Sequence, residues 1–172
     1  MDRRRRSRGQ ALLEFSLVIP VFLTLFMGIV DFGRVVWAQN SLASAAREGA
    51  RFAIVHGGSL SNPCPVGPLN PQFGDPPGTP PGASASCPYP APSKQAVKNA
   101  ALAAAIAGGT SISATVCYGA GCSGDTDAAG ATDARGTPVS VTVTSQLPLV
   151  VPSLLGFSSF TVSGSSTMLV NH

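Results

Sequence analysis

The apolar run at residues 11–30 reads ALLEFSLVIPVFLTLFMGIV, and its only polar side chains are Glu14, Ser16 and Thr24. Twenty helical residues extend about 30 Å, which matches the hydrocarbon core of a bilayer. An arginine-rich head precedes the run, as the positive-inside rule expects of a cytoplasmic flank. The run therefore predicts a single-pass helix that anchors an extracytoplasmic domain to the inner, or cytoplasmic, membrane.

A cleaved secretory signal peptide is an alternative for the same run. Val36-Trp37-Ala38 is a tolerable cleavage site. The apolar region of a signal peptide is usually about 7–15 residues long, so this run is long for one. The alternative stays open at the level of the sequence.

The net charge of +3 takes its sign from the head of the chain. Residues 1–9, the predicted basic cytoplasmic leader, hold five of the eleven basic and one of the eight acidic residues. The remainder therefore carries six basic and seven acidic side chains, which is no surface for nucleic acid. The positive-inside rule explains the arginines better, and we expect no nucleic-acid partner.

The helix is predicted to continue beyond the membrane. From Asp31 to Ala53 there is no proline, and good helix formers dominate. Residues 10–56 are therefore expected to form one transmembrane and extended helix. A surface for close packing is offered by the small residues Ala45, Ala46, Gly49, Ala50 and Ala53.

A loop and a second helix are predicted next. Residues 57–92 hold eleven of the fifteen prolines and are expected to be irregular. Residues 93–107 are rich in alanine, with Ser93 as a candidate N-cap and Gly108-Gly109 as the expected end.

Three strand regions complete the predicted domain at residues 93–172. Apolar residues alternate over residues 111–118, and valines alternate with Ser and Thr over residues 139–144. A weaker strand lies within residues 157–170, where Gly164 interrupts the pattern. Strands joined by loops favour antiparallel pairing, so the predicted fold class is α+β with an antiparallel sheet.

A short apolar stretch, LPLVVPSLLG at residues 147–156, lies between the last two predicted strands. It is too short to span a bilayer. Two interpretations stay open: a loop folded onto the core, or an apolar contact with the membrane surface or a neighbouring subunit.

The four cysteines, Cys64, Cys87, Cys117 and Cys122, all follow the apolar run. An even number in an extracytoplasmic region predicts disulfides. Of the three possible connectivities, Cys64–Cys87 with Cys117–Cys122 is the most local. Zinc is the alternative, but the spacings are not the two-residue pairs of a zinc ribbon or finger, and we expect no metal.

Residues 125–133, DTDAAGATD, match a calcium loop only in part. No acidic or amide residue stands at the fifth position, and Gly136 stands where the bidentate glutamate belongs, so a polar turn is predicted. No metalloprotease, serine-hydrolase or phosphate-loop motif occurs. We therefore expect no enzymatic activity and no cofactor.

Glu14 is the costly residue of the apolar run. A carboxylate among lipid tails is disfavoured by about 2.5–3.5 kcal/mol on insertion scales. A cut between Gly9 and Gln10 would expose the α-amine of Gln10, which is the i,i+4 neighbour of Glu14. In a helical filament, Glu14 could instead neutralise the amine of the next subunit. A glutamate that only snorkels to the headgroups is the alternative.

Residues 8–53 resemble the TadE-like family of tight-adherence (Tad) pilus proteins. The matching elements are Arg8-Gly9-Gln10-Ala11, Glu14-Phe15, Pro20, the Gly28 to Arg34 stretch that ends in Asp31-Phe32-Gly33-Arg34, and Ala45-Ala46-Arg47-Glu48. The resemblance implies a bitopic minor pilin or pseudopilin with a pilin-like domain. It also implies processing at Gly9–Gln10 and an acidic assembly position at Glu14.

The partners that the resemblance implies are a prepilin peptidase, other pilin subunits, the Tad assembly machinery and the lipid bilayer. The implied role is support of pilus assembly, adhesion and biofilm formation. Two implied locations stay open: the membrane itself and a surface pilus. The alternative is a signal-anchored extracytoplasmic binding or surface protein that no prepilin peptidase processes.

Pro20 lies inside the predicted membrane helix. It removes one backbone hydrogen bond and is expected to kink or loosen the helix. A functional bend and an ordinary tolerated membrane proline are both open interpretations.

Overall fold

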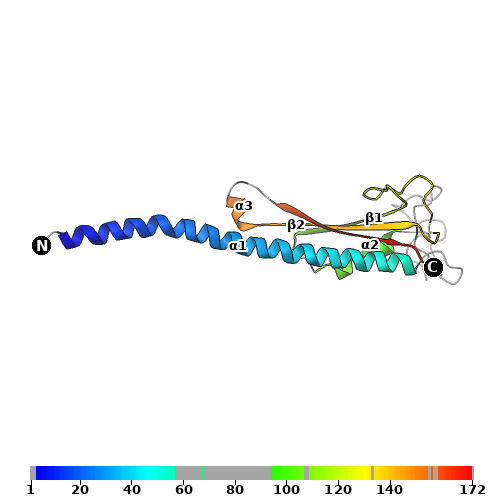
Figure 1. The fold of residues 1–172 in the computed structure, drawn as a ribbon, viewed down its shortest axis with the longest axis horizontal. Coiled ribbons are helices and arrows are strands. Elements are labelled where there is room, and N and C mark those ends of the chain that lie inside the picture. Colours follow the sequence, from blue (N-terminus) through cyan, green and yellow to red (C-terminus); the bar gives the residue numbers. More distant parts are fainter. Residues whose placement is uncertain are drawn as a thin grey trace.

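The computed structural model describes residues 3–56, 67, 94–106, 109–132, 134–154, 156 and 159–171. In this part of the chain, a long helix is followed by a short helix, two strands, a one-turn helix and a third strand (Figure 1). The fold class is α+β, as predicted. The predicted Cys64–Cys87 disulfide and the Ser93 cap lie outside the described residues, as does nearly all of the loop at 57–92.

Helix α1 runs from Arg3 to Val55, which is 53 residues or about 80 Å at 1.5 Å per residue. Pro20 lies inside it, and the helix continues on both sides. At the far end the His56 N–H donates to the Phe52 carbonyl at 3.1 Å, and the two rings stack with their centroids 4.0 Å apart. The predicted long helix is therefore confirmed, and it also includes most of the arginine-rich head.

The sheet contains β1 (Ser111–Tyr118), β2 (Pro138–Leu147) and β3 (Phe160–Leu169) in the order β1-β2-β3, with both pairings antiparallel. β1 coincides with the predicted alternation at 111–118, β2 extends beyond the valine pattern at 139–144, and β3 lies within the weaker strand region predicted at 157–170. Because side chains alternate across a strand, the valines of β2 all point to one face and are fully buried. The opposite face carries hydroxyls, such as Ser113 and Thr144, whose oxygens are 2.7 Å apart.

Helix α2 runs from Gln95 to Ala104, inside the predicted range. The end predicted at Gly108-Gly109 is wrong, because the backbone of Ala105 is already extended. The Ile106 N–H then donates to the Ser41 hydroxyl of α1 at 3.2 Å. A tertiary contact with α1 therefore accompanies the end of the helix, ahead of the glycines.

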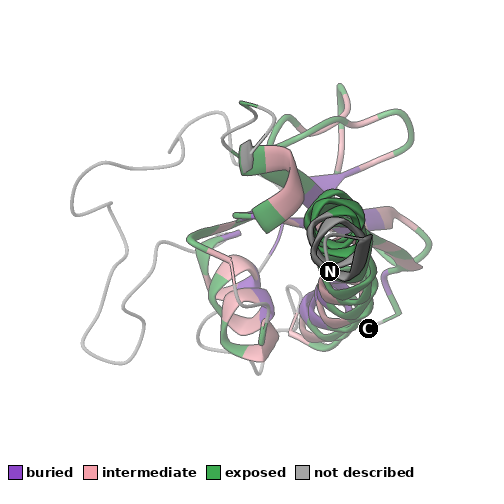
Figure 2. Ribbon diagram, turned by 90° about the vertical axis from the view of Figure 1, so that its left-hand side faces the viewer, coloured by how far each residue is buried: buried purple, intermediate pink, exposed green. Residues whose placement is uncertain are grey.

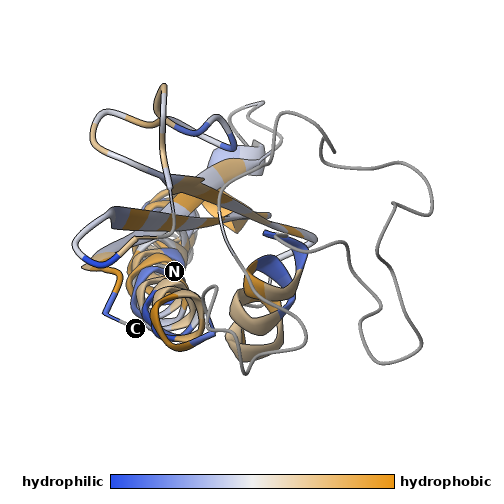
Figure 3. Cartoon of the chain, turned by 90° about the vertical axis from the view of Figure 1, so that its right-hand side faces the viewer, coloured by the Kyte–Doolittle hydropathy of each residue, from blue (hydrophilic) through white to orange (hydrophobic). Residues whose placement is uncertain are grey.

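The hydrophobic core lies between the sheet and the second half of α1. End-on views place α1 and α2 side by side on one face of the sheet (Figures 2 and 3). The small residues of α1 that were predicted to pack closely do so inside this core: Ala45, Ala46, Ala50 and Ala53 are at most 1% exposed. A Cβ added to Gly49 would lie 2.8 Å from the Ala101 Cβ of α2, so the two helices approach closely there.

The apolar stretch at residues 147–156 contains the short helix α3 (Val150–Leu154), which packs against α1. Leu147 and Leu149 are buried in the core. The interpretation of a loop folded onto the core is therefore confirmed for this part of the stretch. Val150, in contrast, remains 44% exposed.

Candidate functional site

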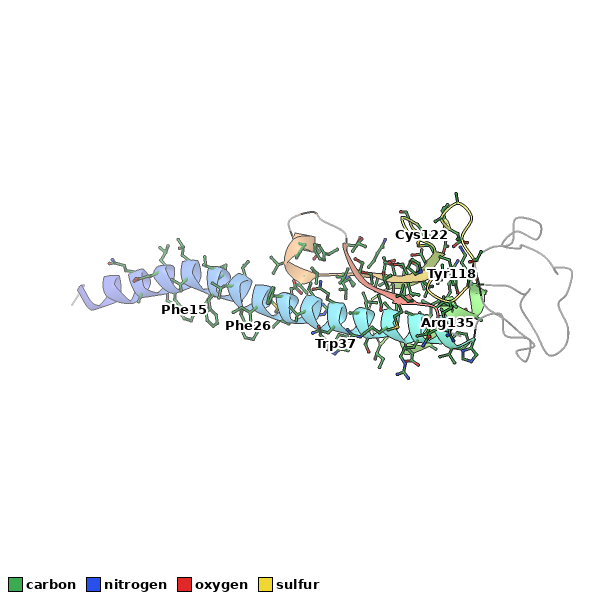
Figure 4. The ribbon with its side chains drawn as sticks, turned by 45° about the vertical axis from the view of Figure 1, so that its right-hand side comes forward. Phe15, Phe26, Trp37, Tyr118, Cys122 and Arg135 are labelled. Atoms are coloured by element: carbon green, nitrogen blue, oxygen red, sulfur yellow. A yellow bond between two sulfur atoms is a disulfide. The ribbon has the colours of Figure 1, made fainter. Side chains whose placement is uncertain are left out.

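The two halves of α1 differ in what surrounds them. The second half is built into the core, whereas every described side chain from Gln10 to Met27 is exposed. Figure 4 shows Phe15 and Phe26 projecting from α1 with no other element beside them. So large an apolar surface is not stable in water and marks a membrane or protein contact.

This exposed half is the candidate membrane anchor. In the described part of the chain, one helix is long and apolar enough to cross a bilayer, by length and composition, and its apolar window has a mean hydropathy of 2.2. None of that window is buried. A soluble core helix would show the opposite, because its apolar residues would be packed inside the protein.

The polar side chains within the anchor differ in how they are satisfied. The Ser16 hydroxyl donates to the Leu13 carbonyl at 2.9 Å, and the Thr24 hydroxyl donates to the Pro20 carbonyl at 2.8 Å. Both hydroxyls are therefore compatible with lipid, because their hydrogen bonds are made within the helix. Glu14 is exposed and makes no ion pair within the described residues. Among the described residues, its carboxylate thus differs from the two hydroxyls, which bond within the helix.

The predicted processing and bending positions lie along the same helix. Gly9 and Gln10 are adjacent helical residues, and Gln10 is four residues before Glu14. Pro20 lies between Glu14 and the point where the core begins. The assignments of Gly9–Gln10 to processing, Glu14 to assembly and Pro20 to a kink stay predictions.

Asp31 marks the junction between the anchor and the domain. It is only 5% exposed, and its Oδ2 accepts the Val151 N–H of α3 at 2.8 Å. Its other carboxylate oxygen lies 3.9 Å from an Arg34 nitrogen, as the i,i+3 spacing predicts. Sequence reasoning missed α3 as a partner, because 120 residues separate the two groups. The sequence signal that could have pointed to a role for Asp31 is its position, because it is an acidic residue directly after the apolar run.

The turn at residues 119–127 is held by the predicted local disulfide. Cys117 and Cys122 are bonded, which confirms that pair. Asp125 accepts the Val116 N–H at 2.9 Å, and Asp127 accepts the Tyr118 N–H at 2.8 Å. The turn therefore folds back on β1 and hydrogen-bonds to its edge.

Two lysines of the α2 region bind the same turn, which sequence reasoning did not foresee. Lys94 is fully buried; its Nζ donates to the Asp125 carbonyl and lies 3.4 Å from the Asp127 carboxylate. The Lys98 Nζ lies 2.8 Å from the Asp125 carboxylate. These two carboxylates therefore hold the turn to β1 and to the lysines of the α2 region. Among the described residues, no group of three or more His, Cys, Asp or Glu could hold a metal ion.

The ion pair of Asp125 predicts an acid-sensitive turn. Partial burial alone would raise the pKa of Asp125, but hydrogen bonds from Lys98 and the Val116 N–H, with the charges of both lysines, hold it below the ordinary 3.8. Because folding lowers this pKa, the stabilisation is complete above the ordinary value and is lost as pH falls through the folded value. We expect Asp125→Asn to flatten the fall in urea midpoint from about pH 5 to about pH 2, and equal slopes in the two proteins would contradict this.

Comparison with known proteins identifies the helix that carries these features. The family model described as TadE-like protein matches residues 9–51, which span the candidate anchor, the Asp31 junction and most of the core-forming half of α1. Searches of the curated proteins and of the solved structures gave no match. The predicted resemblance is therefore confirmed over that helix. The chain carries a TadE-like segment at residues 9–51, and this match supports the interpretation of the chain as a TadE-like protein.

Proposed function

We propose that this protein is a bitopic minor pilin or pseudopilin that supports assembly of a Tad-type pilus, and thereby adhesion and biofilm formation. The observation that carries the proposal is the change of surroundings along α1. One half is an apolar helix exposed on all sides, the other half is a core element, and the TadE-like match runs across both. A subunit of this form is held in a membrane and can pass its anchor into a bundle of like helices.

The proposed topology follows from the two ends of α1. The arginines of residues 3–8 keep the N-terminus in the cytoplasm, and the domain lies on the other side of the membrane. The Cys117–Cys122 disulfide supports this placement, since disulfides persist in oxidising compartments. The role is structural, and the proposal assigns no catalysis to the chain.

Assembly then depends on Glu14 more than on the apolar surface. Lipid tails are as apolar as leucine, so moving the anchor from the bilayer into a helical bundle gains little hydrophobic free energy. A charge pair between Glu14 and the Gln10 amine of a mature neighbouring subunit would be specific in such surroundings. The proposed partners are accordingly other pilin subunits and the Tad machinery, with a prepilin peptidase that creates the amine by cutting at Gly9–Gln10.

The test is the intact mass of the protein from its native host. We expect a mature chain that begins at Gln10, and Gly9→Val should retain the leader because the bulky side chain blocks the cut. An Arg3→Gln control should be processed normally. Native chains that keep their arginines would contradict the proposal and favour the signal-anchored surface protein.

The same measurement also tests signal-peptide cleavage after Ala38. That cut would remove Asp31 and Ala38 from the folded domain, where they are 5% and 0% exposed. It would also leave the Val151 N–H without its carboxylate acceptor. A mature chain that begins at Gln39 would nevertheless overturn the proposed anchor.

A further inference from the structure

The β2–β3 connection lies beside the point where α1 would leave the membrane. In Figure 1, α3 sits at the end of the domain nearest to the exposed half of α1, and the strands lead away from it. The hydrogen bond from the Val151 N–H to Asp31 fixes α3 next to the first residue beyond the apolar run. The connection is therefore the part of the domain that lies closest to the proposed bilayer.

The described residues of this connection expose apolar side chains beside the polar Ser153 and Ser159, and none of them is charged. Val150 is 44% exposed, and Phe160, the first residue of β3, is 49% exposed. Val151 and Pro152 are partly exposed. The sequence contains no Asp, Glu, Lys or Arg after Arg135, so no ionic group of this segment opposes contact with lipid.

The neighbouring surface of α1 also exposes large apolar side chains. Phe32 is 70% exposed and Trp37 is 53% exposed, and aromatic rings of this kind favour the headgroup level of a bilayer. The side chain of Arg34 is 41% exposed beside Asp31, at the level where phosphates of the headgroups would lie. Apolar and cationic groups thus meet at one level of the molecule, as they do in surface-bound membrane segments.

We infer that the α3 connection is a second membrane contact, whose Val150 and Phe160 side chains enter the headgroup–acyl boundary of the leaflet that α1 leaves. This inference rests on the proposed membrane span of α1. Apolar faces of this kind sink about 5–10 Å into the boundary. With two contacts, the domain is held at a fixed tilt on the membrane. A single helix would leave it free to rotate, so the second contact orients the subunit before assembly.

The test uses the full-length chain in phosphatidylethanolamine–phosphatidylglycerol vesicles, with lipids brominated near the headgroup as quenchers. Trp37→Phe removes the single tryptophan, and a new one is placed by Phe160→Trp, or by Val150→Trp as a second probe. Thr167→Trp is the matched control, exposed on the same strand about 24 Å farther along. Phe26→Trp, read with lipids brominated deep in the acyl chains, reports whether α1 itself is inserted.

We expect quenching to remove most of the emission at positions 160 and 150 and to leave position 167 unaffected. Quenching at position 26 without quenching at 160 and 150 would overturn the α3 contact and leave the anchor standing. No quenching at position 26 would overturn the anchor and the α3 contact together. Emission at 160 that shifts to the blue only at high protein-to-lipid ratio would assign this surface to a neighbouring subunit and also overturn the inference. Each variant is scored only if its domain resists proteolysis as the parent's domain does.

Discussion

Gly164→Ala is expected to destabilise the domain by about 3 kcal/mol, the upper range for overpacking of a core. A Cβ on Gly164 of β3 would lie 2.3 Å from the Ala43 nitrogen and 2.5 Å from the Leu42 carbonyl carbon. Both are backbone atoms of α1 and cannot rotate away. The helix and the sheet would have to separate, and the contacts of the fully buried Leu42 would loosen with them.

The measurement is a urea titration of the full chain in detergent micelles, read by pulse proteolysis of the domain. Circular dichroism would report less, because the micelle-bound half of α1 stays helical when the domain unfolds. Gly33→Ala is the control, since a Cβ there meets nothing within 4 Å and the substitution favours the helix by about 1 kcal/mol. Equal urea midpoints for Gly164→Ala and the parent would show that α1 does not approach β3 this closely.

The Glu14→Ala variant is expected to insert into the membrane and to be processed normally, yet to enter the pilus poorly. Loss of the carboxylate leaves the amine of a neighbouring subunit uncompensated in an apolar bundle, which costs about 3 kcal/mol. Incorporation into filaments should therefore drop by more than about tenfold. The readout is immunoblotting of sheared filaments against membranes from cells that express each variant.

Two further variants show whether incorporation depends on the charge of Glu14 or only on a polar side chain of its size. Glu14→Gln keeps the volume and removes the charge, so it should fail as Glu14→Ala does. Ser16→Ala removes a hydroxyl that is already bonded to the Leu13 carbonyl, and it should enter filaments like the parent. Normal incorporation of both Glu14 variants would refute the role of this residue in assembly and leave the membrane anchor intact.

Much of the architecture could be predicted because its causes are local. The run at residues 11–30 has the length and apolarity of a membrane span whatever surrounds it, and the helix formers that follow carry the helix to Val55. The alternating valines at 139, 141 and 143 specify a strand with one buried face. Cys117 and Cys122 are close enough in sequence for their pairing to be the simplest solution.

The contacts that place the candidate site could not be predicted, because their partners are distant in the sequence. Gly164 read as a weak point in a strand, whereas the structure shows that its missing Cβ admits the backbone of α1. No sequence pattern marks Lys94 or Asp31 as buried. Lys94 nevertheless packs against a turn 31 residues later, and Asp31 accepts a hydrogen bond from α3, 120 residues later. The small residues of α1 predicted close packing but not their partners, which prove to be α2 and the sheet of the same chain.

The sequence by itself therefore determined the elements and the candidate membrane anchor, while the tertiary structure decided where the exposed part of α1 ends and what lies beside it. The physical reason is the range of each effect. Helix and strand patterns and the cost of apolar surface depend on neighbours a few residues apart. The Asp31–Val151 hydrogen bond joins groups 120 residues apart, and it exists only because the sheet returns the chain to α1 at the edge of the apolar run.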